Sequence, residues 1–222
     1  MKIIGFDGST IPNSTTAGIL ARALVAASEQ GAETSIVRLK DVITSPFHGA
    51  HDPASLTAKA VYDALPITIK KMVPGWVKKI STDYLFPEEV KPLLRAIEEA
   101  DGLILATPTW WSTPSDYIKI LLNYLTICDY RNYCLRGKVA GFIAVCEEDG
   151  AQHANAIMQN AVTHMGMITP PFCSFFFNRN LKESEQNWQE TDQALVGVNV
   201  VRMCKLLRGE VTGANWDWNS AQ

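Results

Sequence analysis

Hydroxyl-bearing side chains gather in the loop that follows the first apolar run of the chain. Residues 2–6 predict a buried strand and residues 15–30 predict a helix, so this loop lies at a helix N-terminus. The polar residues that could meet a ligand there are Ser9, Asn13, Ser14, Thr15 and Thr16. Unpaired N–H groups and the helix dipole attract anions at such a place, which predicts a phosphate site. The alternative is an N-cap with more hydroxyls than it needs, because Ser and Thr cap helices in any case.

Two common nucleotide-binding motifs are absent from that loop. The stretch from Gly5 to Thr16 contains neither G-x-G-x-x-G nor G-x-x-x-x-G-K-[ST]. The first pattern brings a dinucleotide pyrophosphate against a helix, and the second cradles nucleotide phosphates. The sequence therefore disfavours NAD held in the Rossmann manner.

A second candidate turn follows the apolar run at residues 102–107. It consists of Pro108, Thr109, Trp110, Trp111 and Ser112. In doubly wound parallel sheets, ligands bind outside the carboxyl ends of the strands, so this turn would meet a ligand anchored at the first loop. The alternative is that either tryptophan packs beneath the helix expected from Ser115.

Other kinds of catalytic site lack the residues that they need. The five cysteines include no C-x-x-C pair and the four histidines are scattered, so no metal site is expected. No G-x-S-x-G elbow occurs, and no Ser-His-Asp triad is predicted. Cys146 and Cys173 lie in apolar runs, where we expect reduced thiols that pack as small core residues.

Apolar runs of strand length alternate with amphipathic segments of helix length along the chain. The predicted strands are 2–6, 34–39, 102–107, 139–146 and 168–177, and the predicted helices are 15–30, 87–100, 115–126, 151–165 and 189–207. This alternation predicts an α/β fold with a doubly wound five-stranded parallel sheet that is covered on both faces. We expect residues 1–222 to form a single domain.

The segment at about residues 42–86 is too long for an ordinary connection and predicts an insertion with structure of its own. Met72, Val73, Trp76 and Ile80 give it a short apolar face that needs burial. We expect an ordered cover at a homodimer interface that walls the open side of the ligand pocket. The alternative is packing against the helices of the same chain.

Composition narrows the class of protein. Hydrophobic residues make up 47% and charged residues 19%, which is typical of a chain that folds around a core. The formal charge is −3 and no dense basic block occurs, so nucleic acid is not an expected partner. No early apolar stretch is long enough for a signal peptide or a membrane span, so we expect a cytoplasmic protein without a membrane partner.

Four short motifs together resemble the NAD(P)H-dependent FMN reductase and quinone reductase branch of the flavodoxin-like superfamily, which includes iron–sulfur flavoproteins. The first is the hydroxyl-rich loop with Gly8-Ser9. The others are Gly31-Ala32-Glu33, the stretch at 100–111 that reads Ala-Asp-Gly, apolar run, Thr-Pro-x-aromatic, and Gly137-Lys138-Val139-Ala140. The resemblance implies a flavodoxin-like sheet of strand order 2-1-3-4-5, with flavin mononucleotide (FMN) as cofactor and a homodimer or homotetramer as assembly.

The resemblance also implies roles for individual residues. Ser9, Ser14, Thr15 and Thr16 would hold the FMN phosphate, and residues 108–112 would border the ribityl chain and the ring. The loop at 147–152, with Glu148 and Gly150, would approach the polar edge of the ring.

The sequence departs from the family at three places. Ile11 stands where many FMN reductases carry an arginine, and the cysteines that would ligate an iron–sulfur cluster are absent. Glu147, Glu148 and Asp149 occupy a loop where relatives often have small residues. These carboxylates either point to solvent or disfavour an anionic reduced flavin.

The function implied is an oxidoreductase in which NAD(P)H, as co-substrate, delivers hydride to FMN, which then reduces a small acceptor such as a quinone or free flavin. The flavin carries this chemistry, so the sequence nominates no acid or base residue. A non-enzymatic electron carrier of flavodoxin type is the alternative. A phosphate-ester hydrolase or binding module without flavin would have no use for Trp110 and Trp111.

Overall fold

The computed structural model describes residues 1–43, 46–47, 64–72, 90–130, 133–182, 189–212 and 216, with the backbone alone at 129–130 and 189–190. The predicted insertion at 42–86 therefore lies largely outside the described residues, as do Val73, Trp76 and Ile80. Within the described ranges no helix is long and apolar enough to cross a membrane.

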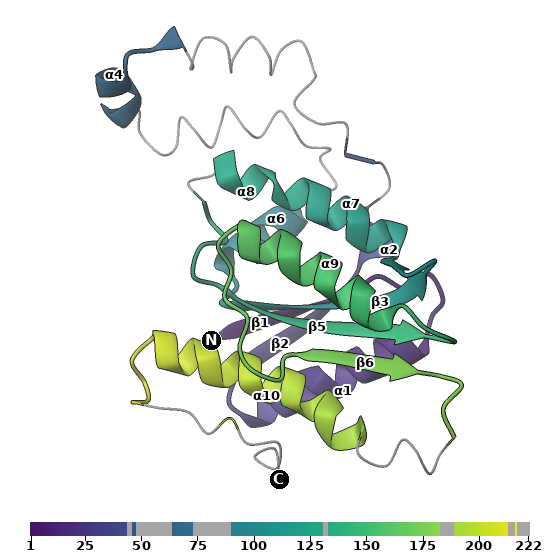
Figure 1. The fold of residues 1–222 in the computed structure, drawn as a ribbon. Coiled ribbons are helices and arrows are strands. Elements are labelled where there is room, and N and C mark those ends of the chain that lie inside the picture. Colours follow the sequence, from purple (N-terminus) through teal and green to yellow (C-terminus); the bar gives the residue numbers. More distant parts are fainter. Residues whose placement is uncertain are drawn as a thin grey trace.

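Five parallel strands form the sheet in the described part of the chain, in the order β2-β1-β3-β5-β6 (Figure 1). Their bounds are β1 Lys2–Asp7, β2 Glu33–Arg38, β3 Gly102–Trp110, β5 Val139–Cys146 and β6 Ser174–Asn178. A two-residue strand, β4 at Thr113–Pro114, pairs antiparallel with the end of β3. Apart from this extra strand, which shifts the numbering, the order is the predicted one.

Helices cover both faces of the sheet, as the alternation predicted. Figure 1 shows α1 (Thr15–Glu29) and α10 (Gln189–Leu207) on one face, and α6 (Lys91–Glu99), α7 (Asp116–Leu125) and α9 (Ala151–His164) on the other. Three short helices complete the described elements, namely α2 (Leu39–Val42), α4 (Ile67–Met72) and α8 (Ile127–Tyr130). This arrangement is the flavodoxin-like doubly wound fold.

The two-residue period of the strands divides the core into two layers. Ile4 and Leu103 pack towards α6, α7 and α9, whereas their neighbours Ile3 and Ile104 pack towards α1 and α10. Successive side chains of a strand point to opposite faces, so a strand that is covered on both faces needs an apolar residue at every position. Many of the residues in β1, β3 and β5 that do this are less than 2% exposed, among them Ile3, Ile4, Phe6, Leu103, Ile104 and Phe142.

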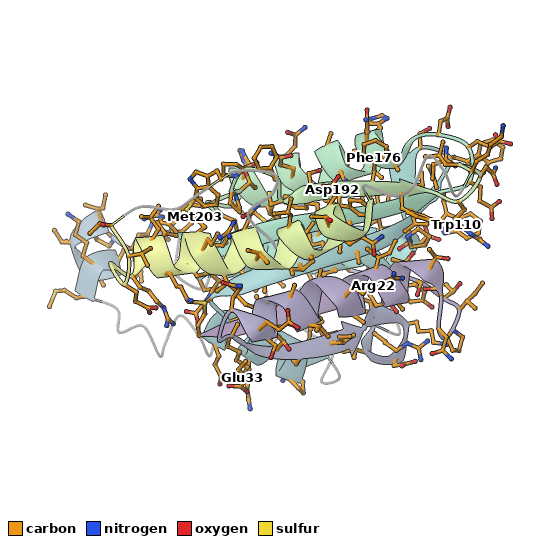
Figure 2. All side chains as sticks on the ribbon, turned by 90° about the horizontal axis from the view of Figure 1, so that it is seen from below. Arg22, Glu33, Trp110, Phe176, Asp192 and Met203 are labelled. Atoms are coloured by element: carbon orange, nitrogen blue, oxygen red, sulfur yellow. The ribbon has the colours of Figure 1, made fainter. Side chains whose placement is uncertain are left out.

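The helices α1 and α10 pack side by side beneath the sheet (Figure 2). Gly197 of α10 lies against the backbone of α1, and a Cβ atom added there would come within 1.8 Å of the Ala23 carbonyl oxygen. The absence of a side chain at this position sets the separation of the two helices.

The last strand is shorter than predicted. Ile168 makes only an isolated bridge to Val139, and β6 begins at Ser174. Pro170 and Pro171 lack the N–H groups that a ladder needs, and Phe172 has a φ of 52°. The chain therefore leaves the sheet between Ile168 and Ser174.

Candidate functional site

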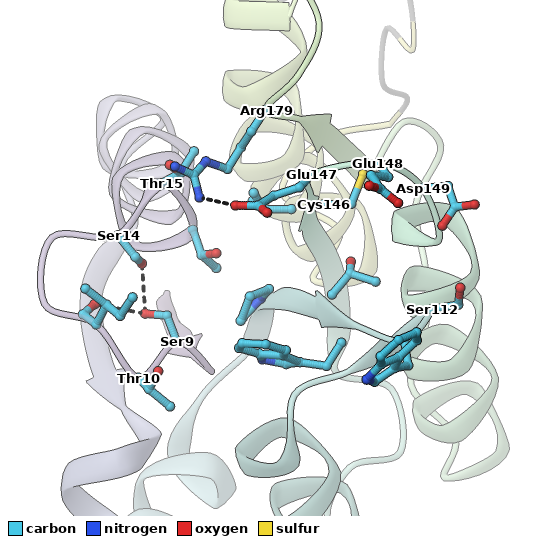
Figure 3. A pocket seen from close by; sticks show the side chains of 17 residues that line it. Ser9, Thr10, Ser14, Thr15, Ser112, Cys146, Glu147, Glu148, Asp149 and Arg179 are labelled. Atoms are coloured by element: carbon cyan, nitrogen blue, oxygen red, sulfur yellow. Dashed lines mark hydrogen bonds and ion pairs between the residues drawn. The ribbon is translucent and has the colours of Figure 1, made fainter.

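The loop after β1 is held by a short chain of side-chain hydrogen bonds. Ser14 is the N-cap of α1, and its Oγ accepts the Ala17 N–H at 3.1 Å. The same hydroxyl donates to Ser9 Oγ at 2.8 Å (Figure 3). Ser9 is buried, and its N–H donates to Asp7 Oδ1 at 2.9 Å. The predicted N-cap and the predicted phosphate loop are therefore one structure.

A buried charge lies beneath this loop. Asp7 is fully buried, and its Oδ2 lies 3.9 Å from Nε of Arg38 at the end of β2. Neither Asp7 Oδ2 nor Arg38 Nη2 has a hydrogen-bond partner. The pair is too long for a hydrogen bond, so the two groups compensate one another by charge alone.

The turn after β3 carries two exposed indole rings. Trp110 pairs with Thr113 across the β3–β4 hairpin, so Trp111 and Ser112 form a two-residue turn, with φ values of 47° and 62°. Turns of this kind favour Asn and Gly, and other residues adopt such backbone angles only under strain. Trp111 is 97% exposed and Trp110 57%, so neither packs beneath α7. The alternative reading of these residues as core tryptophans is wrong.

Gly150 allows the loop after β5 to approach this hairpin. It is the N-cap of α9, with a φ of 80°, and a Cβ atom there would lie 2.6 Å from Ser112 Cα. A side chain at this position would push the two loops apart. The backbone thus explains Gly150 without any ligand contact.

A buried hydroxyl network joins the first two loops. The Ser115 N–H donates to Thr107 Oγ1 at 2.8 Å, and Ser115 Oγ donates to the Gly8 carbonyl oxygen at 2.7 Å. Gly8 lies so close that a Cβ atom there would meet Ile118 Cγ1 at 2.5 Å. The loops after β1 and β3 therefore hold one relative position.

The loop after β5 is fixed from the edge strand. The Arg179 N–H donates to the Cys146 carbonyl oxygen at 2.9 Å, and Asn178 Nδ2 donates to the Glu148 carbonyl oxygen at 2.7 Å. The Arg179 guanidinium pairs with Glu147 through an Nη1–Oε1 distance of 2.8 Å. Sequence patterns around β6 did not single out Asn178 or Arg179.

These loops surround a cavity of about 650 Å³ at the carboxyl edge of the sheet (Figure 3). Every predicted site residue except Asn13 and Gly150 lines it. Asn13, with a φ of 56°, serves the turn before α1. The lining residues that were not predicted as binding residues are Thr10, Ile11, Val145, Cys146, Glu147, Asp149 and Arg179. The sequence predicted Cys146 as a small core residue and placed Val145 in the same strand. Burial raises the pKa of the Cys146 thiol.

The chemistry of the lining agrees with a flavin mononucleotide. One end offers neutral hydroxyl donors at a helix N-terminus, which suits a phosphate. The other end offers indole rings and Thr109, whose Oγ1 is buried without a hydrogen-bond partner. A buried hydroxyl without a partner is costly, and a polyhydroxyl chain would satisfy it. Among the described residues there is no group of three side chains that could hold a metal ion.

Two curated proteins resemble the chain in sequence. An iron–sulfur flavoprotein of Methanocaldococcus jannaschii is 27% identical over 145 residues, which is 65% of this chain and 62% of that protein. The 8-demethyl-8-aminoriboflavin-5′-phosphate synthase of Streptomyces davaonensis is 26% identical over 164 residues, 71% of this chain and 54% of that protein. The chain thus spans about three fifths and about half of the length of these relatives.

Solved structures agree on the fold. RosB with a bound 8-demethyl-8-formylriboflavin-5′-phosphate intermediate has a TM-score of 0.69 and 19% identity, over 94% of this chain and 81% of that one. The apo form of the NADH:FMN oxidoreductase EmoB has a TM-score of 0.51 and 19% identity, over 96% and 91%. The family model described as NADPH-dependent FMN reductase matches residues 1–181. This chain therefore belongs to the NADPH-dependent FMN reductase family.

Proposed function

We propose that this protein uses bound FMN to pass electrons from NAD(P)H to a small acceptor such as a quinone or free flavin. Family membership supports an FMN-dependent oxidoreductase. The observation that carries the proposal is the single cavity that joins a hydroxyl-rich helix N-terminus to two exposed tryptophans. A phosphate and an aromatic ring of the same molecule would occupy its two ends.

Different residues of the cavity would bind different parts of FMN. Ser9, Ser14, Thr15 and Thr16 would donate hydrogen bonds to the phosphate, and Thr109 Oγ1 would meet the ribityl chain. Bound FMN would supply the redox chemistry by accepting a hydride and releasing electrons to the acceptor. Trp110 and Trp111 would border the ring. Because they stand at the rim, they would leave one face of the ring open to a second substrate.

The acidic loop would set the charge around the ring. Glu147, Glu148 and Asp149 line the cavity, and Glu147 is paired with Arg179. The unpaired carboxylates of this loop are exposed, so water screens them. We expect the loop to disfavour an anionic reduced flavin only weakly at physiological ionic strength.

Reconstitution tests this function directly. Apoprotein titrated with FMN should quench the flavin fluorescence with a stoichiometry of one per chain. The loaded protein should then oxidise NADH or NADPH in the presence of a quinone or free FMN. FMN binding without any oxidation of either nicotinamide would leave an electron carrier of flavodoxin type, and no FMN binding would refute the proposal.

We further propose a homodimer in which α4 lies at the interface. Ile67 is 73% exposed and Met72 79% exposed, and apolar side chains so exposed favour burial against a second copy. Replacing both by Ser should convert a dimer to monomers in light scattering. A wild-type monomer, or an unchanged dimer in the variant, would contradict this. The cytoplasmic location stays a prediction.

A further inference from the structure

The phosphate end of the cavity has no positive side chain of its own. The loop from Gly8 to Thr16 contains no Lys, Arg or His, and Ile11 stands at a place where an arginine would neutralise a phosphate. A phosphate monoester carries nearly two negative charges at neutral pH. Hydroxyls and a helix dipole supply only partial charges against it. The site therefore lacks a countercharge within the loop itself.

Among the described residues that line the cavity, Arg179 is the one whose side chain is positively charged and could supply this countercharge. Its backbone is tied to the end of β5 by the 2.9 Å hydrogen bond from its N–H to the Cys146 carbonyl oxygen. From there the side chain extends into the cavity, which is lined on its other side by Thr15 at the start of α1 (Figure 3). Arg179 and Thr15 both line the cavity, so an edge strand and the first helix meet the same ligand space.

We propose that Arg179 binds the phosphate of the bound flavin nucleotide, and that Glu147 is the partner of the guanidinium only until the nucleotide enters. This inference rests on the proposed FMN site. A guanidinium presents several N–H donors in a planar fork that matches phosphate oxygens, and Glu147 meets it only through Nη1 in the described structure. The phosphate would therefore replace Glu147 as the partner of Arg179.

A purely structural role does not account for this pair. The side chains of Arg179 and Glu147 are 53% and 70% exposed, and ion pairs so open to water contribute little to folding stability. Replacing either residue should leave the fold intact. The same exposure gives the guanidinium freedom to change partners at little cost.

Titrations of apoprotein with FMN and with riboflavin test the proposal, because riboflavin differs from FMN only in lacking the phosphate. Arg179→Gln should raise the Kd for FMN about tenfold, which corresponds to about 1.4 kcal/mol, and leave the Kd for riboflavin unchanged. Arg179→Lys should lose less, since the charge stays but the fork does not. Glu147→Gln should tighten FMN binding, because it removes a like charge and a competitor.

The double variant separates a direct contact from a charge left behind. In Arg179→Gln alone, the unpaired Glu147 carboxylate could itself repel the phosphate. Adding Arg179→Gln to the Glu147→Gln variant should still weaken FMN binding about tenfold. Arg22→Gln serves as the matched control, since it removes an arginine of α1 that does not line the cavity, and FMN binding should not change.

Each outcome has one reading. Equal losses of affinity for FMN and riboflavin would overturn the phosphate contact while the FMN site stands. So would the absence of a loss for FMN when Arg179→Gln is added to the Glu147→Gln variant. An unchanged flavin Kd with a raised KM for NADPH would also overturn it and place Arg179 at the nicotinamide donor. If the wild-type protein binds neither flavin, the proposed function itself fails.

Discussion

Replacing Ser14 with Asp separates the two roles of this hydroxyl. Ser14 Oγ caps α1 by accepting the Ala17 N–H, and it faces the cavity that we assign to the phosphate. Asp caps helices as well as Ser does, and its charge is favourable at a helix N-terminus. The apoprotein should therefore keep its stability. A phosphate, by contrast, would meet a like charge.

The loss in FMN affinity follows from two contributions. A hydrogen bond to a charged group is worth about 1.5–3 kcal/mol, and the carboxylate cannot donate it. Two like unit charges about 4 Å apart repel by about 4 kcal/mol at an effective dielectric constant of about 20, and the exposed rim reduces this. Counting the first in full and the second only in part, we expect a loss of at least about 3 kcal/mol, or more than about a hundredfold in Kd.

Ser14→Asn provides the matched control, because Asn has the same shape as Asp, caps equally well and is neutral. Both variants should melt within a few degrees of the wild type in the absence of flavin. Fluorescence titration should show FMN binding nearly abolished in the Asp variant and retained in the Asn variant, with riboflavin binding alike in both. Equal FMN affinities for Asp and Asn would refute the assignment of the phosphate to this loop.

Three further predictions concern packing, strain and pH. Gly197→Ala should lower the free energy of unfolding by about 3 kcal/mol in urea, since its Cβ would lie 1.8 Å from the Ala23 carbonyl oxygen, whereas Gly18→Ala, with nothing nearer than 3.9 Å, should be neutral or stabilising; equal effects would contradict this packing. Trp111→Asn should raise stability by about 1 kcal/mol by relieving the left-handed backbone, and should weaken FMN binding and alter the flavin absorption spectrum; an unchanged spectrum and affinity would remove Trp111 from the site. Burial raises the pKa of Asp101, but hydrogen bonds from the Lys2 N–H and Arg208 outweigh burial and hold the pKa below its ordinary 3.8. The stability that Asp101 adds is therefore present above pH 3.8 and is lost as the pH falls further. Asp101→Asn should therefore destabilise the protein in urea at pH 7 and match the wild type near pH 2; a pH-independent difference would contradict this.

The sequence predicted those parts of the candidate site that lie directly after a strand. The loops after β1 and β3 come immediately after apolar runs, and parallel strands end at a common edge. Ser9 and Trp111 could therefore be assigned to one site although about a hundred residues separate them. Local spacing and one rule of sheet topology were enough for this part of the site.

Arg179 could not be predicted in the same way. The run at 168–177 indicated one long strand, but Pro170 and Pro171 interrupt it, and β6 ends only at Asn178. The position of the guanidinium depends on how far an edge strand extends past its neighbour. That distance is a property of the assembled sheet, set by the register of Cys146 against Asn178, and no local pattern reports it.

The exposure of Trp111 illustrates a different limit. Hydrophobicity favours burial of an indole ring, and the sequence left burial beneath α7 open. The two-residue turn places the ring outside instead, at the cost of left-handed backbone at Trp111 and Ser112. Side-chain preference and backbone preference both argue against this arrangement, so only the surrounding structure can impose it.

Three departures from local preference lie at the carboxyl edge of this sheet. The strained turn at Trp111, the partnerless hydroxyl of Thr109 and the imperfect pair of Asp7 and Arg38 all lie at the carboxyl ends of strands. Left-handed backbone also occurs away from this edge, at Tyr133 and at Phe172 before β6. A fold tolerates strain and unpaired polar atoms where the binding of a ligand compensates for their energetic cost. The three departures at the carboxyl edge therefore support the proposed binding site there, on physical grounds that do not depend on similarity to other proteins.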